Sequence, residues 1–469
     1  MGCPARILST QPYLSVNQQL KDLHKVLTHL KDRTPRLVGS GKLGMNDIHA
    51  SWAQYMAIWR QGGARKLYFV KTDISNCYDS IIQEKLVQIM ETIIKEELQE
   101  ECVVRKYFNF SLQGGQVRKT YQRHAAQLSN FIQDFTNFAK SQVIEKNLHG
   151  VVFVDKVLYQ HLSAETVLQI LRSHIFNNIV KVGRQYYLQN EGISQGSILS
   201  TLLCNFYYAC MERDHIALQS DELLMRVVDD YLFVSPSLES ATGFLRTMLA
   251  GIKDYNCHTN VDKVMSNFPC RVVENQSIEY IETGWFPWSG LLFNMQTLEA
   301  AMDYTRYAGA SIKDTMNFDF VREPGKTFER KLIGSLRQKC HDMFLDPAVN
   351  SPSQIFTSIY HLFLLTMLNF HACARSLPVK QRVEDNPGFF YDVLKSVSYS
   401  MMRILQKQQT ACAENLNESQ LNALITWLCW KAFLTGVVAV KKHLRQSDLI
   451  SLESIAGDDL PSVFENIMV

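Results

Sequence analysis

A chain of 469 residues is longer than one hydrophobic core usually spans, so two or three domains are expected. Hydrophobic residues make up 46% and charged residues 20%, as in an ordinary globular protein, and a net charge of only +2 means that any nucleic-acid-binding surface must be local. Eleven cysteines with no CxxC pair and no regular spacing argue against a zinc site and a secreted disulfide framework, and favour a reducing compartment.

Neither the N-terminus nor the most apolar stretch predicts membrane insertion. The N-terminal sequence MGCPARILST has no apolar signal core, and Arg6 stands where a myristoylation motif has Ser or Thr. Residues 421–440 are the most membrane-like run, but they contain Asn422, Thr426 and Lys431. A buried helix is favoured there over a membrane span, and no membrane partner is expected.

Residues 1–65 are predicted to be helical and rather polar. Leucines and valines recur on one face of residues 17–31, which is the spacing of an amphipathic helix. A glycine-containing stretch, RLVGSGKLG, leads to a second helix from about residue 46 to 60, with Asn46 as a plausible N-cap. Because GSGKLG lacks the G-x-x-x-x-G-K-[ST] spacing of a phosphate-binding loop, a simple turn is the favoured interpretation.

A short apolar strand at residues 67–70 is followed by Asp73, within KTDISNCYDSI, and then by a predicted helix at residues 83–97. A strand that ends at Asp73 and leads into a helix places Asp73 and Tyr78 near one edge of a sheet. The alternative for Asp73 taken alone is an N-cap or turn residue.

Residues 98–165 have the pattern of an insertion. Residues 103–124 contain interleaved aromatic side chains and no acidic residue, and Gly114-Gly115 suits the turn of a hairpin. Such a β-ribbon either holds a nucleic-acid backbone or presents a solvated basic face. Its basic residues are Arg105, Lys106, Arg118, Lys119 and Arg123.

Residues 165–182 are predicted to form a helix and residues 185–188 a strand. The sequence GISQGSILSTLLCNFYYACME then runs from a glycine-flanked loop into a long apolar helix. Small residues at Gly192, Gly196 and Ser197 allow a ligand to approach the backbone closely, and Gln195 is placed to reach a template or nucleotide. On its own the pattern also fits an ordinary helix-entry turn.

Residues 223–236, LLMRVVDDYLFVSP, are predicted to form a β-hairpin of two buried strands with Asp229 and Asp230 at its tip. Adjacent carboxylates in an apolar hairpin must be paired or bind a cation, and hard oxygen ligands suit Mg²⁺. An Asp-rich turn without a function is the alternative for this pair in isolation.

The remaining chain is predicted to be mostly helical. A helix at residues 239–255 and a return to a strand at 259–263 precede the aromatic turn at 284–292, where Trp288 either stacks on a nucleic-acid strand or belongs to the core. From about residue 300 onward every predicted element is a helix. The helix at 326–344 is basic, and its Lys331 and Arg337 either contact phosphates or are solvated. The other helices are predicted at residues 355–374, 389–407, 419–444, 447–455 and 460–467.

In chain order these elements have the layout of a polymerase palm: a strand ending in Asp, a glycine loop entering a helix, and a hairpin with Asp-Asp. In polymerases, two Mg²⁺ ions about 3.5–4 Å apart stabilise the attacking 3′-hydroxyl and the leaving pyrophosphate. Ions so close together need shared anionic ligands, and three carboxylates from two strand ends can supply them.

Four stretches closely resemble motifs A, B′, C and E of the telomerase reverse transcriptase family in its vertebrate-like form. They are LYFVKTDISNCYDSI, EGISQGSILSTLLCNFYYACME, LLMRVVDDYLFV and FPWSGLLF. RLVGSGKLGMNDIHASW resembles the segment before motif A, and KLIGSLRQKCHDMFLD, TWLCWKAFL and LPSVFENIM resemble the thumb of the family. The resemblance runs from about residue 17 to the C-terminus.

The resemblance implies roles position by position. Asp73, Asp229 and Asp230 are the expected ligands of two Mg²⁺ ions. Lys263 matches the motif D lysine, a candidate general acid for pyrophosphate departure. Tyr78 would crowd a ribose 2′-hydroxyl, and the nucleotide and template side would be lined by Gln195, Gly196 and Val228. The expected primer grip consists of Trp288, Ser289 and Gly290. The candidates for contact with the nucleic-acid backbone are Arg105, Lys106, Arg118, Lys119, Lys331 and Arg337.

The implied fold class is α+β, a right-hand polymerase palm with an antiparallel sheet and flanking helices, plus an all-helical thumb. The implied domains are a helical remnant of the fingers at residues 1–65, a palm at 66–300 with an insertion at about 98–165, and a thumb at 301–469. The implied activity is that of the catalytic subunit of telomerase, an RNA-directed DNA polymerase that extends chromosome 3′ ends. Expected partners are the telomerase RNA template, telomeric single-stranded DNA, deoxynucleoside triphosphates and holoenzyme proteins, in the nucleus at telomeres.

The sequence departs from the family pattern in two ways. Ser194 replaces the proline usual in the glycine loop, which loosens the turn without removing chemistry. No telomere-binding domain, RNA-binding domain or finger motif 1 or 2 is visible before motif A, so an N-terminally truncated chain is expected. The alternative function is therefore a weak or inactive isoform that only binds nucleic acid or partner proteins. A retroelement reverse transcriptase is a third possibility, against which the telomerase-like thumb and insertion argue.

Overall fold

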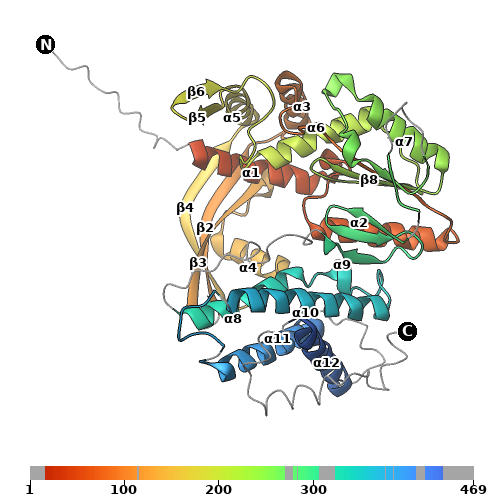
Figure 1. Ribbon diagram of the computed structural model, residues 1–469. Helices are drawn as coiled ribbons and strands as arrows, with labels where there is room; N and C mark the ends of the chain where they lie inside the picture. The colour runs from red at the N-terminus through yellow and green to blue at the C-terminus, as the bar shows by residue number, and fades with distance from the viewer. Residues whose placement is uncertain are drawn as a thin grey trace.

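The computed structural model describes residues 16–113, 116–269, 278–282, 284–305, 323–374, 376–383, 385–407 and 418–436. The predicted turn at Gly114-Gly115 and the helices predicted at 447–455 and 460–467 lie outside these ranges. Within them, helices and several β-sheets make an α+β protein, as the sequence predicts (Figure 1).

A five-stranded sheet in the order β10-β9-β1-β8-β7 carries the predicted acidic residues. β1 pairs antiparallel with β8 and with β9, and β10 runs parallel to β9. Because only two residues join β7 to β8, these strands form the predicted hairpin. The strands are β1 (Tyr68–Asp73), β7 (Leu223–Val227), β8 (Asp230–Ser235), β9 (Met265–Ser266) and β10 (Glu279–Tyr280).

Both faces of this sheet are buried, because successive side chains of a strand point to opposite sides. Phe69 and Leu232 belong to a core that also includes the C-terminal helices, whereas Val70 and Phe233 belong to a second core on the other face. The helices that contribute to this second core are α1 (Val16–Arg33), α3 (Gln83–Glu97), α5 (Ala164–Phe176), α6 (Ser200–His215) and α7 (Leu238–Ala250).

The first two helices are confirmed with small changes at their ends. α1 covers the predicted amphipathic stretch, and a 3-10 turn, η1 (Pro35–Val38), leads from it toward α2 (Met45–Gln61). The predicted N-cap of α2 is wrong. Gly44 occupies the cap position, and Asn46 lies inside the helix, where its side-chain oxygen contacts the His341 ring at 2.6 Å.

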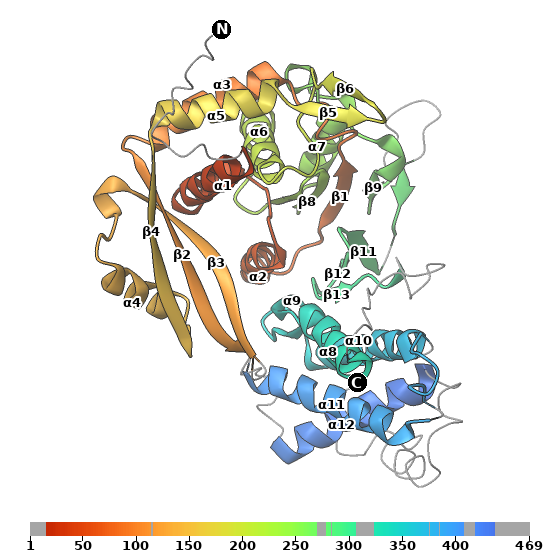
Figure 2. The ribbon, with the colours of Figure 1, turned by 90° about the vertical axis from the view of Figure 1, so that its left-hand side faces the viewer.

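The insertion is a three-stranded antiparallel sheet in the order β3-β2-β4. The predicted hairpin is confirmed as β2 (Cys102–Gln113) and β3 (Gln116–Gln127), whereas β4 (Val151–Leu162) is a strand that the sequence did not predict. A 3-10 turn, η2 (Leu128–Asn130), and α4 (Phe135–Glu145) connect β3 to β4. Figures 1 and 2 show this ribbon reaching from the palm side of the molecule toward the C-terminal helices.

Some local predictions after the insertion are wrong. α5 ends at Phe176, and the residues that follow form β5 (Ile179–Val182), which pairs with the predicted strand β6 (Gln185–Leu188). β-branched residues favour the strand, and Gly183 with φ 61° supplies the turn. The predicted helix at 239–255 is α7 followed by a 3-10 turn, η3 (Lys253–Tyr255), and residues predicted to re-enter a strand form another such turn, η4 (Val261–Lys263).

A second three-stranded sheet leads into the helical thumb. Its strands are β11 (Trp285–Trp288), β12 (Leu291–Asn294) and β13 (Ala300–Met302), so the chain is not helical from residue 300 onward as predicted. The helix predicted at 326–344 is wrong in its length, because it ends at Lys339 and a short separate helix begins at Asp342; the later helices agree with the predicted ones within the described ranges. The thumb helices are α8 (Pro324–Lys339), α9 (Asp342–Leu345), α10 (Pro352–Ala374), α11 (Pro387–Lys407) and α12 (Glu418–Gly436).

α10 is the helix that, within the described residues, is long and apolar enough to cross a membrane, and 61% of its most apolar window is buried inside the protein. Its Phe356 and Phe363 share a core with Trp52 of α2 and Phe286 of β11. This shared core joins the thumb helices to the palm. The division of the chain at residues 65 and 300 stays a prediction.

Candidate active site

Asp73 is the last residue of β1 and lies directly opposite Asp230, the first residue of β8. The backbone N–H of Ile74 donates to the carbonyl oxygen of Asp229 over 3.0 Å, which places Asp229 at the same edge of the sheet. Directly opposed residues of antiparallel strands have Cα atoms about 4.5–5.5 Å apart. The structure therefore brings together the three acidic residues that the sequence marked.

Val228 and Asp229 form the turn between β7 and β8. Val228 has a φ of 59°, in the left-handed region that a β-branched residue rarely adopts. This conformation costs roughly 1–2 kcal/mol and persists only where the surrounding structure holds it. A strained turn therefore determines how Asp229 is presented, and the predicted role of Val228 toward a nucleotide stays a prediction.

The carboxylates are poorly solvated and repel one another. Burial raises the pKa of Asp230 to about 6, with Lys71 opposing the rise and the Asp73 and Asp229 carboxylates adding to it. Burial, with a contribution from Asp73, also raises the pKa of Asp229. Asp230 Oδ1 lies 4.0 Å from Lys71 Nζ and has no hydrogen-bond partner among the described residues. A bound cation relieves both the repulsion and the missing contact.

Lys263 places a positive charge at this edge. Its Nζ donates to both carboxylate oxygens of Asp73, at 3.0 and 3.1 Å, and these bonds raise the pKa of Lys263. The backbone explains its position, because the N–H of Asn260 donates to the Asp73 carbonyl over 2.8 Å and the Asn260 side chain caps η4. Lys263 and Asp73, 190 residues apart in the chain, are thus in direct contact.

The donor set fits Mg²⁺ chemically, because three carboxylates offer hard oxygen ligands at one edge of a sheet. Within the described ranges, no three His, Cys, Asp or Glu side chains are already gathered as a metal-binding cluster. Lys263 lies against Asp73 instead, so a divalent ion that uses the Asp73 oxygens competes with this lysine. The buried oxygen of Asp230 that accepts no hydrogen bond among the described residues is the observation that favours a cation.

Tyr78 lies in the turn after β1, against the glycine loop. Ile193 N–H donates to the Tyr78 carbonyl over 2.9 Å, and Gly192 N–H donates to the Ile81 carbonyl over 3.1 Å. Gly192 has φ 66°, and a Cβ there would lie 2.5 Å from the backbone of this turn, so glycine is required. The Tyr78 side chain is half-buried, and burial raises the pKa of its hydroxyl, with Thr201 of α6 opposing the rise.

The rest of the glycine loop lies at the entry to α6. Gln195 and Gly196 are exposed, and Gly196 has φ 91°. Ser200 Oγ donates to the carbonyl of Ser194 and so anchors the residue that departs from the family pattern. The contacts of Gln195 and Gly196 with a template or nucleotide stay predictions.

Trp288 is a core residue. It is only 1% exposed and packs against Phe293, with ring centroids 6.2 Å apart, so of the two interpretations the core one is confirmed and stacking on a nucleic-acid strand is corrected. Ser289 and Gly290, at φ 48° and 78°, form the tight turn between β11 and β12. The backbone N–H of Ser289 lies near enough to the Asp230 carboxylate to lower its pKa, which places this turn beside the acidic residues.

The basic residues near the base of the ribbon are used inside the protein. Arg105 is 0% exposed, and its guanidinium donates to the carbonyls of Ile132 and Gln133, at 2.7 and 2.8 Å, among four aromatic rings. Lys106 forms an ion pair of 2.6 Å with the buried Asp22 of α1. The expectation that Arg105 and Lys106 contact phosphates is therefore corrected, because neither charge faces solvent without a partner.

Other basic candidates differ in exposure. Arg123 pairs with the same buried aspartate of α1 at 2.7 Å. Arg118 and Lys119 are exposed, and the Lys119 Nζ lies 4.1 Å from the centroid of the Phe108 ring. Lys331 and Arg337 are exposed on α8, whose buried residues join the shared core. Contacts between these exposed residues and nucleic acid stay predictions.

Two groups at the site were not predicted from the sequence. Lys71 lies two residues before Asp73 on β1, so the period of a strand places both side chains on one face, and this spacing was a usable signal. The Ser289 N–H that reaches Asp230 is a backbone group. Its position depends on how the second sheet packs against the first, which no side-chain pattern reveals.

Comparisons with known proteins agree with these motifs. The family described as "Telomerase reverse transcriptase, C-terminal extension" matches residues 326–451. The chain is 32% identical to the telomerase reverse transcriptase of Canis lupus familiaris, over 97% of this chain and 43% of that protein. It is 35% identical to that of Mus musculus, over 90% of this chain and 38% of that protein. The chain thus spans less than half the length of the curated relatives that it matches.

Among solved structures, the chain resembles one described as telomerase from Candida albicans in complex with a TWJ fragment of telomeric RNA. The TM-score is 0.58 at 16% sequence identity, and the match covers 94% of this chain and 57% of that one. At this level of identity the likeness shows the fold alone. It agrees with a palm followed by a helical thumb.

Proposed function

Because this chain belongs to the telomerase reverse transcriptase family, we propose that it forms the palm and thumb of an RNA-directed DNA polymerase that extends chromosome 3′ ends. The observation that carries the proposal is the register of the central sheet, which sets Asp73 against Asp230 beside Asp229. Three carboxylates at one edge are the ligand set that nucleotidyl transfer with two metal ions needs.

The division of chemical work follows from the residues at this edge. Two bound Mg²⁺ ions supply charge stabilisation for the attacking 3′-hydroxyl and the departing pyrophosphate. Asp73, Asp229 and Asp230 are the groups that would hold these ions. Lys263, a cation in contact with Asp73, would donate a proton to the pyrophosphate as it leaves, and its position at this edge supports that role.

Substrate selection would fall to the turn after β1 and the glycine loop. The turn that carries Tyr78 is held against this loop by two backbone hydrogen bonds, one to the Tyr78 carbonyl and one to the Ile81 carbonyl, which favours a fixed tyrosine that crowds a ribose 2′-hydroxyl. The partners of such a reaction are deoxynucleoside triphosphates, an RNA template and telomeric single-stranded DNA, together with telomerase holoenzyme proteins. The proposed location is the nucleus, at telomeres.

A second function is favoured by the contact between Lys263 and Asp73. Lys263 Nζ donates to both carboxylate oxygens of Asp73, so a divalent ion has to displace this lysine before it can use them. The alternative is therefore a chain that binds a nucleic-acid duplex or partner proteins without polymerising.

Primer extension on a supplied RNA–DNA duplex with Mg²⁺ distinguishes the two functions. Asp229→Ala should lower the extension rate by about 10³-fold or more, because a loss of roughly 4 kcal/mol of charge stabilisation corresponds to this factor. Asp392→Ala, at an exposed position of α11, is the matched control and should extend like the parent. A parent chain that binds the duplex but extends no primer would support the second function.

A further inference from the structure

The glycine segment, defined here as residues 38–42, is part of the central sheet and not the simple turn that the sequence favours. Gly41 pairs in parallel with Arg226 of β7. The N–H of Arg226 donates to the Ser40 carbonyl over 2.9 Å, and the N–H of Lys42 donates to the Arg226 carbonyl over 2.7 Å. The segment therefore continues the sheet beyond β7, the strand that leads into the Val228–Asp229 turn.

The Arg226 side chain ties this segment to the turn. It is completely buried, and its Nε donates to Glu212 Oε1 over 2.6 Å. One terminal nitrogen donates to Asn205 Oδ1 over 3.0 Å and to the Val228 carbonyl over 3.4 Å, while the other donates to the Val38 carbonyl over 3.4 Å. A single guanidinium thus contacts α6, the glycine segment and the strained residue of the Val228–Asp229 turn.

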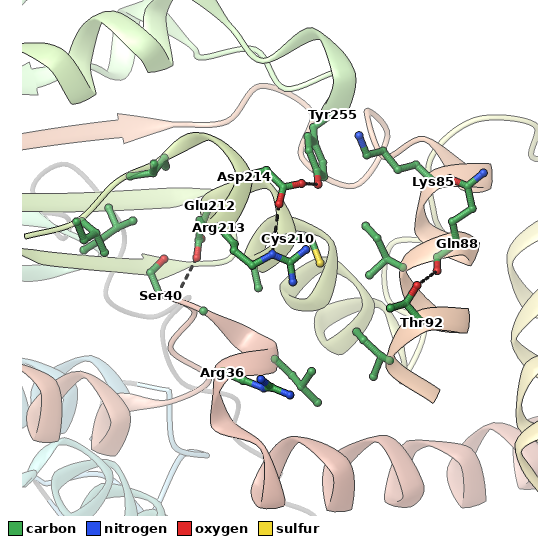
Figure 3. Close-up of a pocket in the computed structure, with 18 of the residues that line it drawn as sticks. Arg36, Ser40, Lys85, Gln88, Thr92, Cys210, Glu212, Arg213, Asp214 and Tyr255 are labelled. Atoms are coloured by element: carbon green, nitrogen blue, oxygen red, sulfur yellow. Dashed lines mark hydrogen bonds and ion pairs between the residues drawn. The ribbon is translucent and has the colours of Figure 1, made fainter. Parts of the chain in front are cut away.

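Glu212 completes the connection. Its Oε1 also accepts the Tyr231 hydroxyl over 2.9 Å, and its Oε2 accepts the backbone N–H of Ser40 over 2.8 Å. Figure 3 shows Ser40 and Glu212 facing each other at the wall of a cavity of about 800 Å³, with Lys85 and Gln88 of α3 across it. A cavity separates the segment from α3, so polar contacts with α6 and β7, together with the packing of Val38 on the second core, hold the segment in place.

The glycines are explained by this close approach. A Cβ on Gly41 would lie 2.1 Å from Asn205 Oδ1 and 2.7 Å from the Val38 carbonyl oxygen. A Cβ on Gly39, which has φ 54°, would lie 2.4 Å from Glu212 Oε2. Both positions therefore exclude larger residues for a reason unrelated to phosphate binding.

We propose that Arg226, Glu212 and the glycine segment are positioning elements that hold the Val228–Asp229 turn in the conformation that presents Asp229 and Asp230 to metal ions. The inference rests on the proposed function. Val228 is strained and persists only because its surroundings fix it, and its carbonyl accepts from the buried Arg226. Removing one partner of a buried ion pair leaves the other charge uncompensated. Loss of either Arg226 or Glu212 is therefore expected to release the Val228–Asp229 turn.

Two measurements on the folded chain test this. Residues that orient metal ligands from behind typically change metal affinity by about 10–100-fold when mutated. Arg226→Gln and Glu212→Gln should therefore raise the Mn²⁺ dissociation constant, measured by paramagnetic resonance, by about tenfold or more. Amide hydrogen exchange of residues 223–235, measured without metal, should become about tenfold faster, because the turn opens more often.

Matched variants separate positioning from general loss of stability. Gly41→Ala should behave like Arg226→Gln, whereas Gly44→Ala, where a Cβ meets nothing within 4 Å, should behave like the parent. Leu171→Ala in the core of α5 should lower the melting temperature without raising the Mn²⁺ dissociation constant. If Arg226→Gln does not fold, Glu212→Gln and Gly41→Ala carry the test.

The outcomes distinguish this inference from the function on which it rests. Mn²⁺ binding that is lost in Asp229→Ala but unchanged in all three positioning variants, with unchanged exchange at 223–235, would overturn the inference and leave the metal site intact. A parent chain that binds no Mn²⁺ at the three carboxylates would overturn the proposed function and this role in it.

Discussion

The sheet edge around Asp73 and the ribbon formed by β2, β3 and β4 both bury charge, but they treat it in opposite ways. At the edge, burial and the neighbouring carboxylates raise the pKa of Asp230 to about 6, and its Oδ1 accepts no hydrogen bond among the described residues. In the ribbon, Arg105 donates to two carbonyls among aromatic rings and Lys106 pairs with Asp22. A buried carboxylate that its neighbouring carboxylates destabilise indicates a place for a cation, whereas a buried cation held by carbonyls, rings or a carboxylate indicates architecture.

Arg105→Ala tests the architectural side of this comparison and should have the largest effect on stability. The free energy of unfolding should fall by about 3 kcal/mol or more, because the change leaves a cavity among four rings and two carbonyls without a donor. Urea denaturation measures this. The exposed Lys119→Ala, on the neighbouring strand, should change stability by less than about 0.5 kcal/mol. Equal effects of the two changes on stability would contradict the distinction between the buried, structural Arg105 and the exposed Lys119.

Lys263→Met tests the cation at the sheet edge. Loss of a positioned proton donor should slow primer extension by about 10²-fold at saturating nucleotide, with the duplex dissociation constant unchanged. Lys263→Arg should also be slow, because a guanidinium keeps the charge but releases its proton poorly. The exposed Lys21→Met on α1 is the control. Unchanged extension by Lys263→Met would remove this lysine from proton transfer.

Asp230→Asn tests whether the buried Asp230 carboxylate charge lowers the stability of the folded protein. Folding raises the pKa of Asp230 from 3.8 to about 6, so the folded state binds the proton more tightly, and stability falls as pH rises from about 4 through 6. At pH 7.5 without divalent ions, the variant should unfold with a free energy higher than the parent's by about 1–3 kcal/mol.

The same experiment contains its own control. At pH 2.5 the parent carboxyl is protonated in both states, so the advantage of Asp230→Asn should vanish. Added Mg²⁺ should stabilise the parent more than the variant. An advantage of equal size at both pH values would show that the carboxylate charge is not the cause.

Lys119→Ala should have the smallest effect. One lost phosphate contact reduces the slope of log affinity against log salt by about 1, which duplex binding at several salt concentrations measures. Arg105→Lys, at a buried position, should leave this slope unchanged if it folds. A slope unaltered by Lys119→Ala would mean that this end of the ribbon touches no phosphate.

The same comparison explains what could be predicted from sequence. The meeting of Asp73 with Asp229 and Asp230 was predictable, because each lies at the end of a short apolar strand and sheet register brings such ends together. The burial of Arg105 was not predicted, and the burial of Trp288 was only one of two open interpretations, because an aromatic or basic residue on a strand looks the same whether its face is covered or free. The pairing of Gly41 with Arg226 was missed for a related reason, since contacts between residues 185 positions apart leave no local pattern.

Anomalous scattering from crystals grown with Mn²⁺ tests the central claim most directly, because it locates the ion itself. The account predicts Mn²⁺ at the edge of the central sheet, within about 2.0–2.6 Å of oxygens from Asp73, Asp229 and Asp230, with Lys263 displaced from Asp73. Crystals saturated with Mn²⁺ that show no ion at this edge, and that keep Lys263 bound to Asp73, would contradict it.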